Sequence, residues 1–374
     1  MAHDLDLGLR FIVEPSNTSL SSTEAEHLRQ LKPAGIMLRR RNFRHDAPYE
    51  EWLATYAKLL ADVRDAIGRD RIIVSIDHEG GQVHRVPPPI TRFPYPAFYS
   101  SQTGAVRAVA QAMAEELRSL GINVSYSPCA DIHSNPNNPV INQRAFGTDP
   151  AAVGEAAVCC AAELRANGIV PCAKHFPGHG DTSTDSHVDL PIVDRSEAEL
   201  EQREFIPFRR LIENKIEMIM SAHIMLPQVA PGVPATISPE IITGILRKKM
   251  GFSGVTIADA LGMKGIQAHV SLEDLGRKAH QAGIDLFLMV GDSVSVADAL
   301  TVRASLETML SEDPSRQVKL WEAQERVENL LKSLPQHVCT RMPEQSLLKH
   351  ARLAETLGKN AQWASFEFNP LGFT

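Results

Sequence analysis

The sequence has no uninterrupted apolar run that approaches the ~18 residues a helix needs to cross a membrane. Its opening residues, Met1–Asp6, are polar and acidic and lack the apolar centre of a secretory signal peptide. Cysteine is scarce, since the chain has five and no two of them follow a C-x-x-C spacing. An odd number without that spacing disfavours both a disulfide framework and a cysteine-based zinc site. We therefore expect reduced thiols, a cytoplasmic location and no membrane partner.

The sequence also lacks an excess of basic residues. It has 38 Lys and Arg against 45 Asp and Glu, which gives a net charge of -7. Proteins that bind nucleic acid normally carry a basic surface, so we expect no nucleic acid partner. The run Arg39-Arg40-Arg41 fits a solvated turn. No phosphate-binding motif is visible, and no cofactor is expected.

Against these absences stands a regular alternation of short β-branched runs with longer amphipathic segments. The candidate strands are Leu9–Val13, Gly35–Leu38, Arg71–Asp77, Asn123–Ser127, Ile169–His175, Met218–His223, Gly254–Asp259 and Asp285–Val290. Eight runs, several of them apolar almost throughout, are typical of a closed parallel barrel covered by helices. The pattern predicts an α/β fold, a single (β/α)8 TIM-type barrel over residues 1–311.

Amphipathic segments between these runs predict the helices of the barrel. They are Ser22–Leu31, Tyr49–Ile67, Ala105–Leu120, Ala151–Asn167, Glu197–Asn214, Pro239–Lys249, Leu272–Ala282 and Val294–Leu310. Ser21 begins a stretch that resembles a capping box ending at Glu24. After Glu312 the strand signal stops, and Gln317–Leu334 and Glu344–Leu357 predict two more helices. We expect residues 312–374 to form a helical C-terminal extension packed on the barrel.

Polar residues collect where the predicted strands end. Asp77, the pair Lys174-His175, His223 and Asp259 each stand at such a point. The C-terminal rim carries the active site in (β/α)8 barrels. An open, doubly wound sheet would place its ligand at the same strand ends. The pattern therefore predicts a site without fixing its chemistry.

The fourteen residues from Lys174 to His187 form a long polar loop with three histidines and two aspartates. One interpretation is a metal site, but Pro177-Gly178 makes a helix that would pair His175 with His179 improbable, and no metal is predicted. A second is a catalytic acid/base, with Asp185 orienting His187 across one intervening residue. A third is a solvated loop in which the aspartate makes only a local turn. The residues themselves leave the last two open.

This loop, with the segments around it, resembles glycoside hydrolase family 3 in its β-N-acetylglucosaminidase (NagZ-type) branch. The resemblance covers roughly residues 8 to 310 in motif order. Its other carriers are Ile76–Arg85, Gly121–Asn123, Ser127–Ile132, Asn142–Gly147, Ser221–Ile224, Thr256–Leu261 and Gly283–Asp285. Each segment alone is weak, and their order together with the loop is specific.

The resemblance implies a role for each matched residue. Asp259 matches the nucleophile, His187 the acid/base and Asp185 its partner. Positions that bind N-acetylglucosamine are matched by Asp77, Arg85, Arg144, Lys174 and His175. The implied reaction is a retaining exo-β-N-acetylglucosaminidase that releases N-acetylglucosamine from peptidoglycan-derived muropeptides during cell-wall recycling.

The implied set makes chemical sense. A retaining glycosidase needs a carboxylate on one side of the anomeric carbon and a proton donor on the other. Asp259 would form the glycosyl-enzyme intermediate, and His187, with an ordinary pKa near ~6.5, would protonate the leaving oxygen and then deprotonate water. Lys174 and Arg144 would donate to sugar hydroxyls, and Asp77 would accept from them.

Two departures from the family pattern lie near these residues. Ala258 and Ala260 flank the nucleophile where the family has Ser and Asp, and Ala145 follows Arg144 where it has Ser. They put the rate and the aglycone preference in doubt more than the reaction.

Three alternative functions stay open. One is a β-N-acetylglucosaminide phosphorylase, because a histidine acid/base repels phosphate less than a carboxylate would. The others are a barrel that binds a glycan without turnover and a metal-dependent amidohydrolase.

Overall fold

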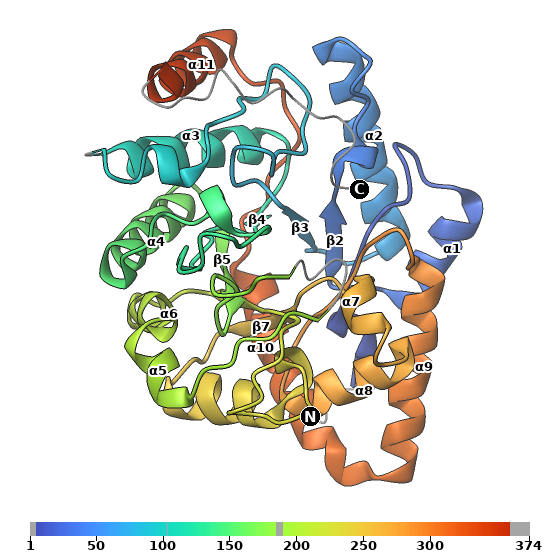
Figure 1. Cartoon of the computed structure of the whole chain (residues 1–374). Coiled ribbons are helices and arrows are strands. Elements are labelled where there is room, and N and C mark those ends of the chain that lie inside the picture. The colour runs from blue at the N-terminus through green and yellow to red at the C-terminus, as the bar shows by residue number, and fades with distance from the viewer. Residues whose placement is uncertain (1–4, 103, 185–189, 360–374) are drawn as a thin grey trace.

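The computed structural model describes residues 5–102, 104–184 and 190–359, and its centre is one parallel sheet of eight strands. The strands are β1 (Phe11–Val13), β2 (Gly35–Leu38), β3 (Ile73–Ile76), β4 (Val124–Ser125), β5 (Val170–Phe176), β6 (Met218–Ser221), β7 (Val255–Ala258) and β8 (Phe287–Met289). Each overlaps its predicted run. In space they follow the order β7-β6-β5-β4-β3-β2-β1-β8 (Figure 1).

The sheet closes on itself between β7 and β8. A parallel bridge joins Ile257 to Leu286, and the backbone N–H groups of Ala258 and Leu261 donate to the carbonyls of Leu286 and Leu288. The remaining neighbours pair along the strands, for example Phe11 to Val13 with Phe287 to Met289. The prediction of a single (β/α)8 barrel is confirmed.

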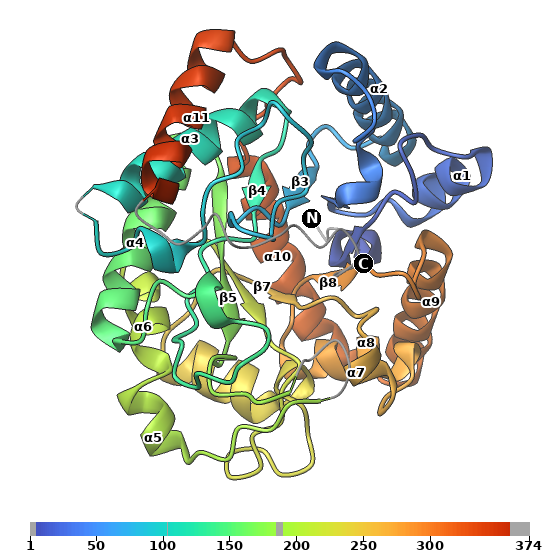
Figure 2. The same cartoon turned by 45° about the horizontal axis from the view of Figure 1, so that its top comes forward.

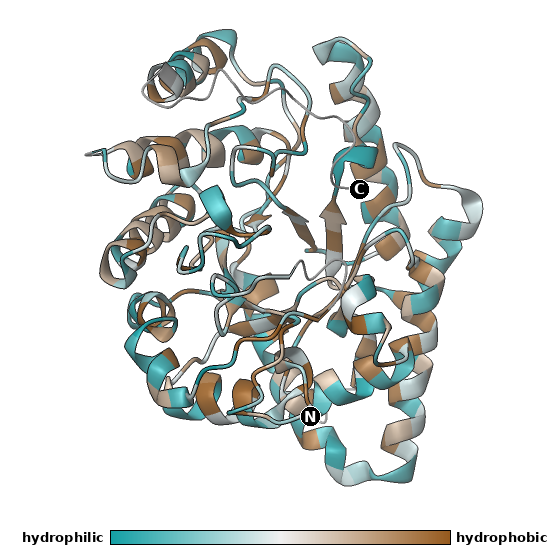
Figure 3. Cartoon of the chain, in the orientation of Figure 1, coloured by the Kyte–Doolittle hydropathy of each residue, from teal (hydrophilic) through white to brown (hydrophobic). Residues whose placement is uncertain are grey.

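Helices surround the strands (Figures 1 and 2). They are α1 (Ser22–Leu31), α2 (Tyr49–Ile67), α3 (Ala105–Ser119), α4 (Pro150–Ala166), α5 (Glu197–Gln202), α6 (Phe205–Glu213), α7 (Lys264–Gln267), α8 (Leu272–Ala282) and α9 (Val296–Glu312). Between β6 and β7 the segment Glu240–Lys249 (η6) is a π-helix. The longest of them, α2, buries its apolar residues and leaves most of its charged ones at the surface, and Figure 3 shows hydrophilic and hydrophobic stretches on the helices.

Three local details differ from the sequence prediction. The first strand begins at Phe11 instead of Leu9, because Leu7–Arg10 forms a 3-10 helix whose N-cap Asp6 accepts from the N–H of Gly8. The helix expected over Glu197–Asn214 is interrupted at Arg203, whose side chain turns to the carboxylate of Asp181 at 2.7 Å. The Ser21 cap is present, but Glu24 turns to the N–H of Ser16 instead of closing a capping box.

The C-terminal segment supplies part of the core. In α10 (Gln317–Ser333), Val327, Leu330 and Leu331 are buried in one cluster with the inward-facing side chains of the strands. This helix lies behind the strands in the middle of the ring (Figure 2). The predicted boundary between a barrel of residues 1–311 and an extension of 312–374 stays a prediction, although the core crosses it.

The last helix, α11 (Glu344–Lys359), lies against α3. Its buried His350 lies between two carboxylates of that helix, 3.2 Å from Glu115 and 3.0 Å from Glu116. Before it, the N–H of Met342 donates to the hydroxyl of Tyr49. In the part of the chain that is described, no helix combines the length and the hydropathy that a bilayer crossing demands.

Candidate active site

The predicted site residues that are described lie at the C-terminal ends of three strands. Asp77 follows β3 directly, Lys174 and His175 are near the end of β5, and Asp259 follows β7. Because parallel strands of a barrel end at the same rim, these side chains share one face of the molecule. Arg144 reaches it from the loop between β4 and α4.

A buried network of charges joins the binding residues. Lys174 Nζ lies 2.6 Å from the carboxylate of Asp77 and 2.6 Å from that of Glu79. Arg144 grips the same Glu79 with two nitrogens, each 2.9 Å from an oxygen. Arg85 stands farther off, 3.9 Å from Asp77. The structure thus brings together Asp77, Lys174 and Arg144, with Arg85 at the edge.

Opposite charges keep this network ionised in spite of its burial. Burial alone would raise the pKa of Glu79, but Arg144 and Lys174 outweigh it and hold that pKa well below its usual range. Burial would likewise lower the pKa of Lys174, and the carboxylates of Asp77 and Glu79 raise it instead. An ammonium group and a guanidinium group fixed in this way are donors suited to sugar hydroxyls.

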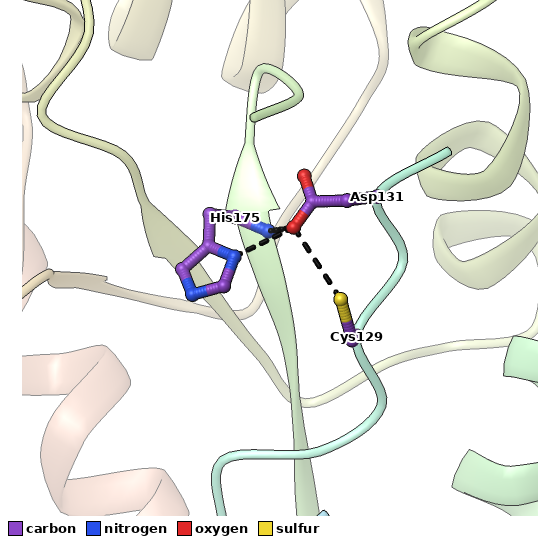
Figure 4. A group of neighbouring side chains, drawn as sticks. All are labelled: Cys129, Asp131 and His175. Atoms are coloured by element: carbon purple, nitrogen blue, oxygen red, sulfur yellow. Dashed lines mark hydrogen bonds and ion pairs between the residues drawn. The ribbon is translucent and has the colours of Figure 1, made fainter. Parts of the chain in front are cut away.

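His175 is hydrogen-bonded to Asp131. The carboxylate Oδ2 lies 2.6 Å from His175 Nδ1 and 3.5 Å from the thiol of Cys129 (Figure 4). Its other oxygen accepts from the backbone N–H of His179 at 2.6 Å. Burial opposes the charge of Asp131, but His175 stabilises it and the pKa of the carboxyl falls to about 2.

Cys129, Asp131 and His175 are close enough together to be considered as a metal site. Two ligands on a tetrahedral zinc ion stand about 3.3 Å apart, since each is roughly 2.0–2.2 Å from the metal. The 2.6 Å between Asp131 and His175 is a hydrogen-bond distance. The cluster is therefore better explained by the positioning of a histidine.

Asp259 is half-buried at the end of β7. Its backbone N–H donates to the carbonyl of Ser221 on β6, and its Oδ1 accepts from the N–H of Ala260 at 2.7 Å. Burial raises the pKa of the Cys172 thiol inside the barrel, Lys174 opposes this, and the negative charges of Asp77 and Asp259 both add to it. The charges of Asp259, the predicted nucleophile, and of Asp77 and Lys174 in the binding network therefore all affect the same thiol inside the barrel.

Asp185 and His187 lie outside the described residues. On either side of them, Asp181 and Arg195 form an ion pair of 3.0 Å. His223, which the sequence leaves without a role, contacts the hydroxyl of Thr236 at 2.9 Å and the carbonyl of Ala260 at 3.1 Å. It supports the backbone next to Asp259.

Sequence reasoning missed two residues, Glu79 and Asp131. Both stand in segments that carry the family resemblance, yet neither is a predicted site residue. Both are buried, at 3% and 1% exposure, and each organises two predicted binding residues or their loop. Glu79 stands two positions after Asp77 and Asp131 two positions after Cys129, in the loops that follow β3 and β4, and exposed acids share such positions.

A cavity of about 450 Å³ lies elsewhere, between α3 and residues 336–346. None of the predicted site residues lines it. The candidate catalytic and binding residues lie away from this cavity, at the rim of the barrel.

The fold is a (β/α)8 barrel, and acidic and basic side chains pair at the C-terminal ends of its strands. Enzymes with this fold have their active sites at that end of the barrel. The family model described as "Glycosyl hydrolase family 3 N terminal domain" matches residues 9–330. The chain belongs to this family. The match reaches residue 330 and so includes most of α10, in agreement with the packing of Val327, Leu330 and Leu331 against the side chains inside the barrel.

Curated relatives and a solved structure agree with that membership. "Beta-hexosaminidase A" of Pseudoalteromonas piscicida is 36% identical over 71% of this chain and 48% of its own length, so this chain spans about half of that relative. "Beta-hexosaminidase" of Neisseria meningitidis serogroup C is 35% identical over 71% of this chain and 74% of its own. NagZ from Neisseria gonorrhoeae has a TM-score of 0.72 at 26% identity, over 94% of this chain and 97% of that chain.

Proposed function

We propose that this protein is a retaining exo-β-N-acetylglucosaminidase. Asp259 attacks the anomeric carbon and forms the glycosyl-enzyme intermediate. His187, oriented by Asp185, protonates the leaving oxygen and then activates water. Asp77, Arg85, Arg144, Lys174 and His175 bind the N-acetylglucosamine ring.

The observation that supports the proposal is that an acidic side chain and a set of fixed donors share one rim of the barrel. Asp259 follows β7, and Lys174, which is paired with Asp77 at 2.6 Å, lies near the end of β5 on the same rim. A sugar needs several hydroxyl partners of both kinds, and this network offers ammonium, guanidinium and carboxylate groups together. The relatives from Pseudoalteromonas piscicida and Neisseria meningitidis, both named as β-hexosaminidases, support the same reaction class.

We also propose peptidoglycan-derived muropeptides as the substrate and the cytoplasm as the location. The likeness to NagZ supports the first. The five cysteines are all free thiols, which fits a reducing compartment and supports the second.

The test is a time course on 4-nitrophenyl β-N-acetylglucosaminide, with and without phosphate. Wild-type protein should release nitrophenol and free N-acetylglucosamine. Asp259→Ala should lower kcat by about 10⁴-fold or more, and His187→Ala by about 10²–10⁴-fold. The exposed pair member Asp62 provides a matched acidic control, so Asp62→Ala should keep full activity.

The outcomes separate the candidate functions. Full activity of Asp259→Ala would overturn the assignment of the nucleophile. Sugar 1-phosphate formed in place of free sugar would make the protein a phosphorylase. Binding of N-acetylglucosamine without turnover by the wild type would leave a glycan-binding barrel, and loss of activity with a chelator would favour metal-dependent hydrolysis.

A further inference from the structure

Asp131 is a buried acid that no step of the proposed reaction uses. Its side chain is fully enclosed, and within the described residues its hydrogen-bond partners are His175, His179 and Cys129. Oδ2 accepts from the backbone N–H of His175 at 3.2 Å and contacts the ring Nδ1 of the same residue at 2.6 Å. One carboxylate thus fixes both the backbone and the ring of His175.

The two ring nitrogens of His175 face groups of opposite kinds. An ionised carboxylate only accepts hydrogen bonds, so the nitrogen that faces Asp131, Nδ1, carries a proton. The other nitrogen, Nε2, lies 3.5 Å from Nη2 of Arg144. A guanidinium only donates, so Nε2 is best satisfied as a bare lone pair.

We propose that Asp131 is a positioning residue that fixes His175 as the neutral tautomer with its proton on Nδ1. Nε2 is then an acceptor, and a sugar hydroxyl that donates to it replaces its long 3.5 Å contact with Arg144. This inference rests on the proposed function for the identity of the sugar, but the tautomer itself does not depend on it.

The groups around Nε2 restrict which ligand group can bind next to it. Arg144, which contacts Nε2, and Lys174, which precedes His175, are both donors held by Glu79. A hydroxyl has one proton and two lone pairs, so it can donate to His175 while accepting from a neighbouring cation. A fluorine in its place cannot donate. A carboxylate or phosphate would face the lone pair of Nε2 without a proton to give.

The first test measures the tautomer by NMR of protein labelled with ¹⁵N in histidine rings, with His175→Gln used to assign the signal. Wild type at pH 7.5 should show a protonated Nδ1 and a bare Nε2. Asp131→Asn should move His175 towards a mixture of tautomers. Cys129→Ala, which removes the weak thiol contact to the same oxygen, should leave the signal unchanged.

The second test measures inhibition by N-acetylglucosamine and by analogues in which each hydroxyl in turn is replaced by fluorine. One analogue should bind the wild type about two- to twelvefold more weakly than the parent sugar. That difference should largely vanish in Asp131→Asn and persist in Cys129→Ala. A structural defect alone would weaken the parent and all analogues together.

A proton on Nε2 in the wild type, or discrimination unchanged in Asp131→Asn, would overturn the proposal. If Asp131→Asn does not fold, the wild-type tautomer still decides. If neither the parent sugar nor any analogue binds the wild type, the proposed function is wrong, and so is the predicted hydrogen bond from a sugar hydroxyl to His175. The NMR measurement then tests the tautomer of His175 independently.

Discussion

At the scale of single residues, Glu79 holds together the predicted binding residues Arg144 and Lys174. It is 3% exposed and pairs with both Arg144 and Lys174. Without this carboxylate Arg144 would lose the acid it pairs with in a buried position, and Lys174 would keep only Asp77. The binding geometry therefore depends on an acid that holds two of the predicted binding residues.

Replacing this acid by its amide tests that dependence. Glu79→Gln should lower the free energy of unfolding by about 3–5 kcal/mol, because it leaves buried cations short of a counter-charge. It should also raise KM for the β-N-acetylglucosaminide. Urea unfolding and steady-state kinetics measure both. Asp62→Asn, which removes the acid of the exposed pair with Lys58, should cost less than about 1 kcal/mol; equal costs for the two variants would contradict this account.

Asp131 predicts a specific dependence of stability on pH. Its pKa in the folded protein is about 2, below the value of 3.8 that is usual for an aspartate. Between these values the unfolded chain binds a proton that the folded one does not, so the stabilisation is complete above about pH 5 and is lost as the pH falls towards 2. The shift corresponds to about 2 kcal/mol. Urea unfolding at several pH values should show the gap between wild type and Asp131→Asn narrowing by that amount; a constant gap would refute it.

The placement of the candidate residues was predictable from sequence only where an apolar strand ends beside them. Asp77 and Asp259 directly follow such strands and Lys174 and His175 lie near the end of one, as expected, while their roles stay a prediction. Glu79 and Asp131 escaped because nothing local distinguishes a buried acid that pairs with distant cations from an exposed one. Their partners stand 65 and 44 positions away in the chain.

At the scale of elements, the strands were predictable because each is an apolar run of the length that a covered parallel strand needs. What the sequence did not show is set by contacts between elements. Arg203 breaks a predicted helix to reach Asp181, and Asp6 caps a 3-10 turn that shortens β1. The depth of α10 in the core depends on which faces of distant segments meet, which periodicity does not specify.

The buried face of α10 gives a prediction at this scale. Leu330 is 6% exposed and packs with the side chains inside the ring of strands. Leu330→Ala should therefore lower the free energy of unfolding by about 2–5 kcal/mol. Val318 is on the same helix and 62% exposed, so Val318→Ala should change it by less than about 0.5 kcal/mol. Equal effects in urea unfolding would mean that α10 does not belong to the core.

At the scale of the whole molecule, three buried histidines make the fold sensitive to acid. Burial lowers the pKa of His78 and His179 to about 4 and that of His280 to about 3, and a neighbouring arginine adds to the shift at His78 and at His280. Unfolded histidine titrates near ~6.5, so below that pH the unfolded chain takes up protons that the folded chain does not. Stability is therefore present above about pH 6.5 and is lost as the pH falls towards 4.

The slope of that loss can be measured. Each such histidine contributes about 1.4 kcal/mol per pH unit between its two pKa values. Within the described part of the chain, neither ring nitrogen of His78 has a hydrogen-bond partner. His78→Leu should thus flatten the dependence of the unfolding free energy between pH 6.5 and 4, while His269→Gln, at an exposed position, should not. If the slope of the unfolding free energy against pH is unchanged in His78→Leu, His78 does not contribute to the loss of stability in acid.

The central claim is that a covalent bond forms between the sugar and the carboxylate at the end of β7. A fluorinated N-acetylglucosaminide with a good leaving group slows release of the intermediate, so that the adduct accumulates and can be digested and sequenced by mass spectrometry. The account predicts one sugar per chain, on the peptide that contains Asp259, and none in Asp259→Asn. Steady hydrolysis by the wild type with no adduct, or with the sugar on another residue, would contradict it.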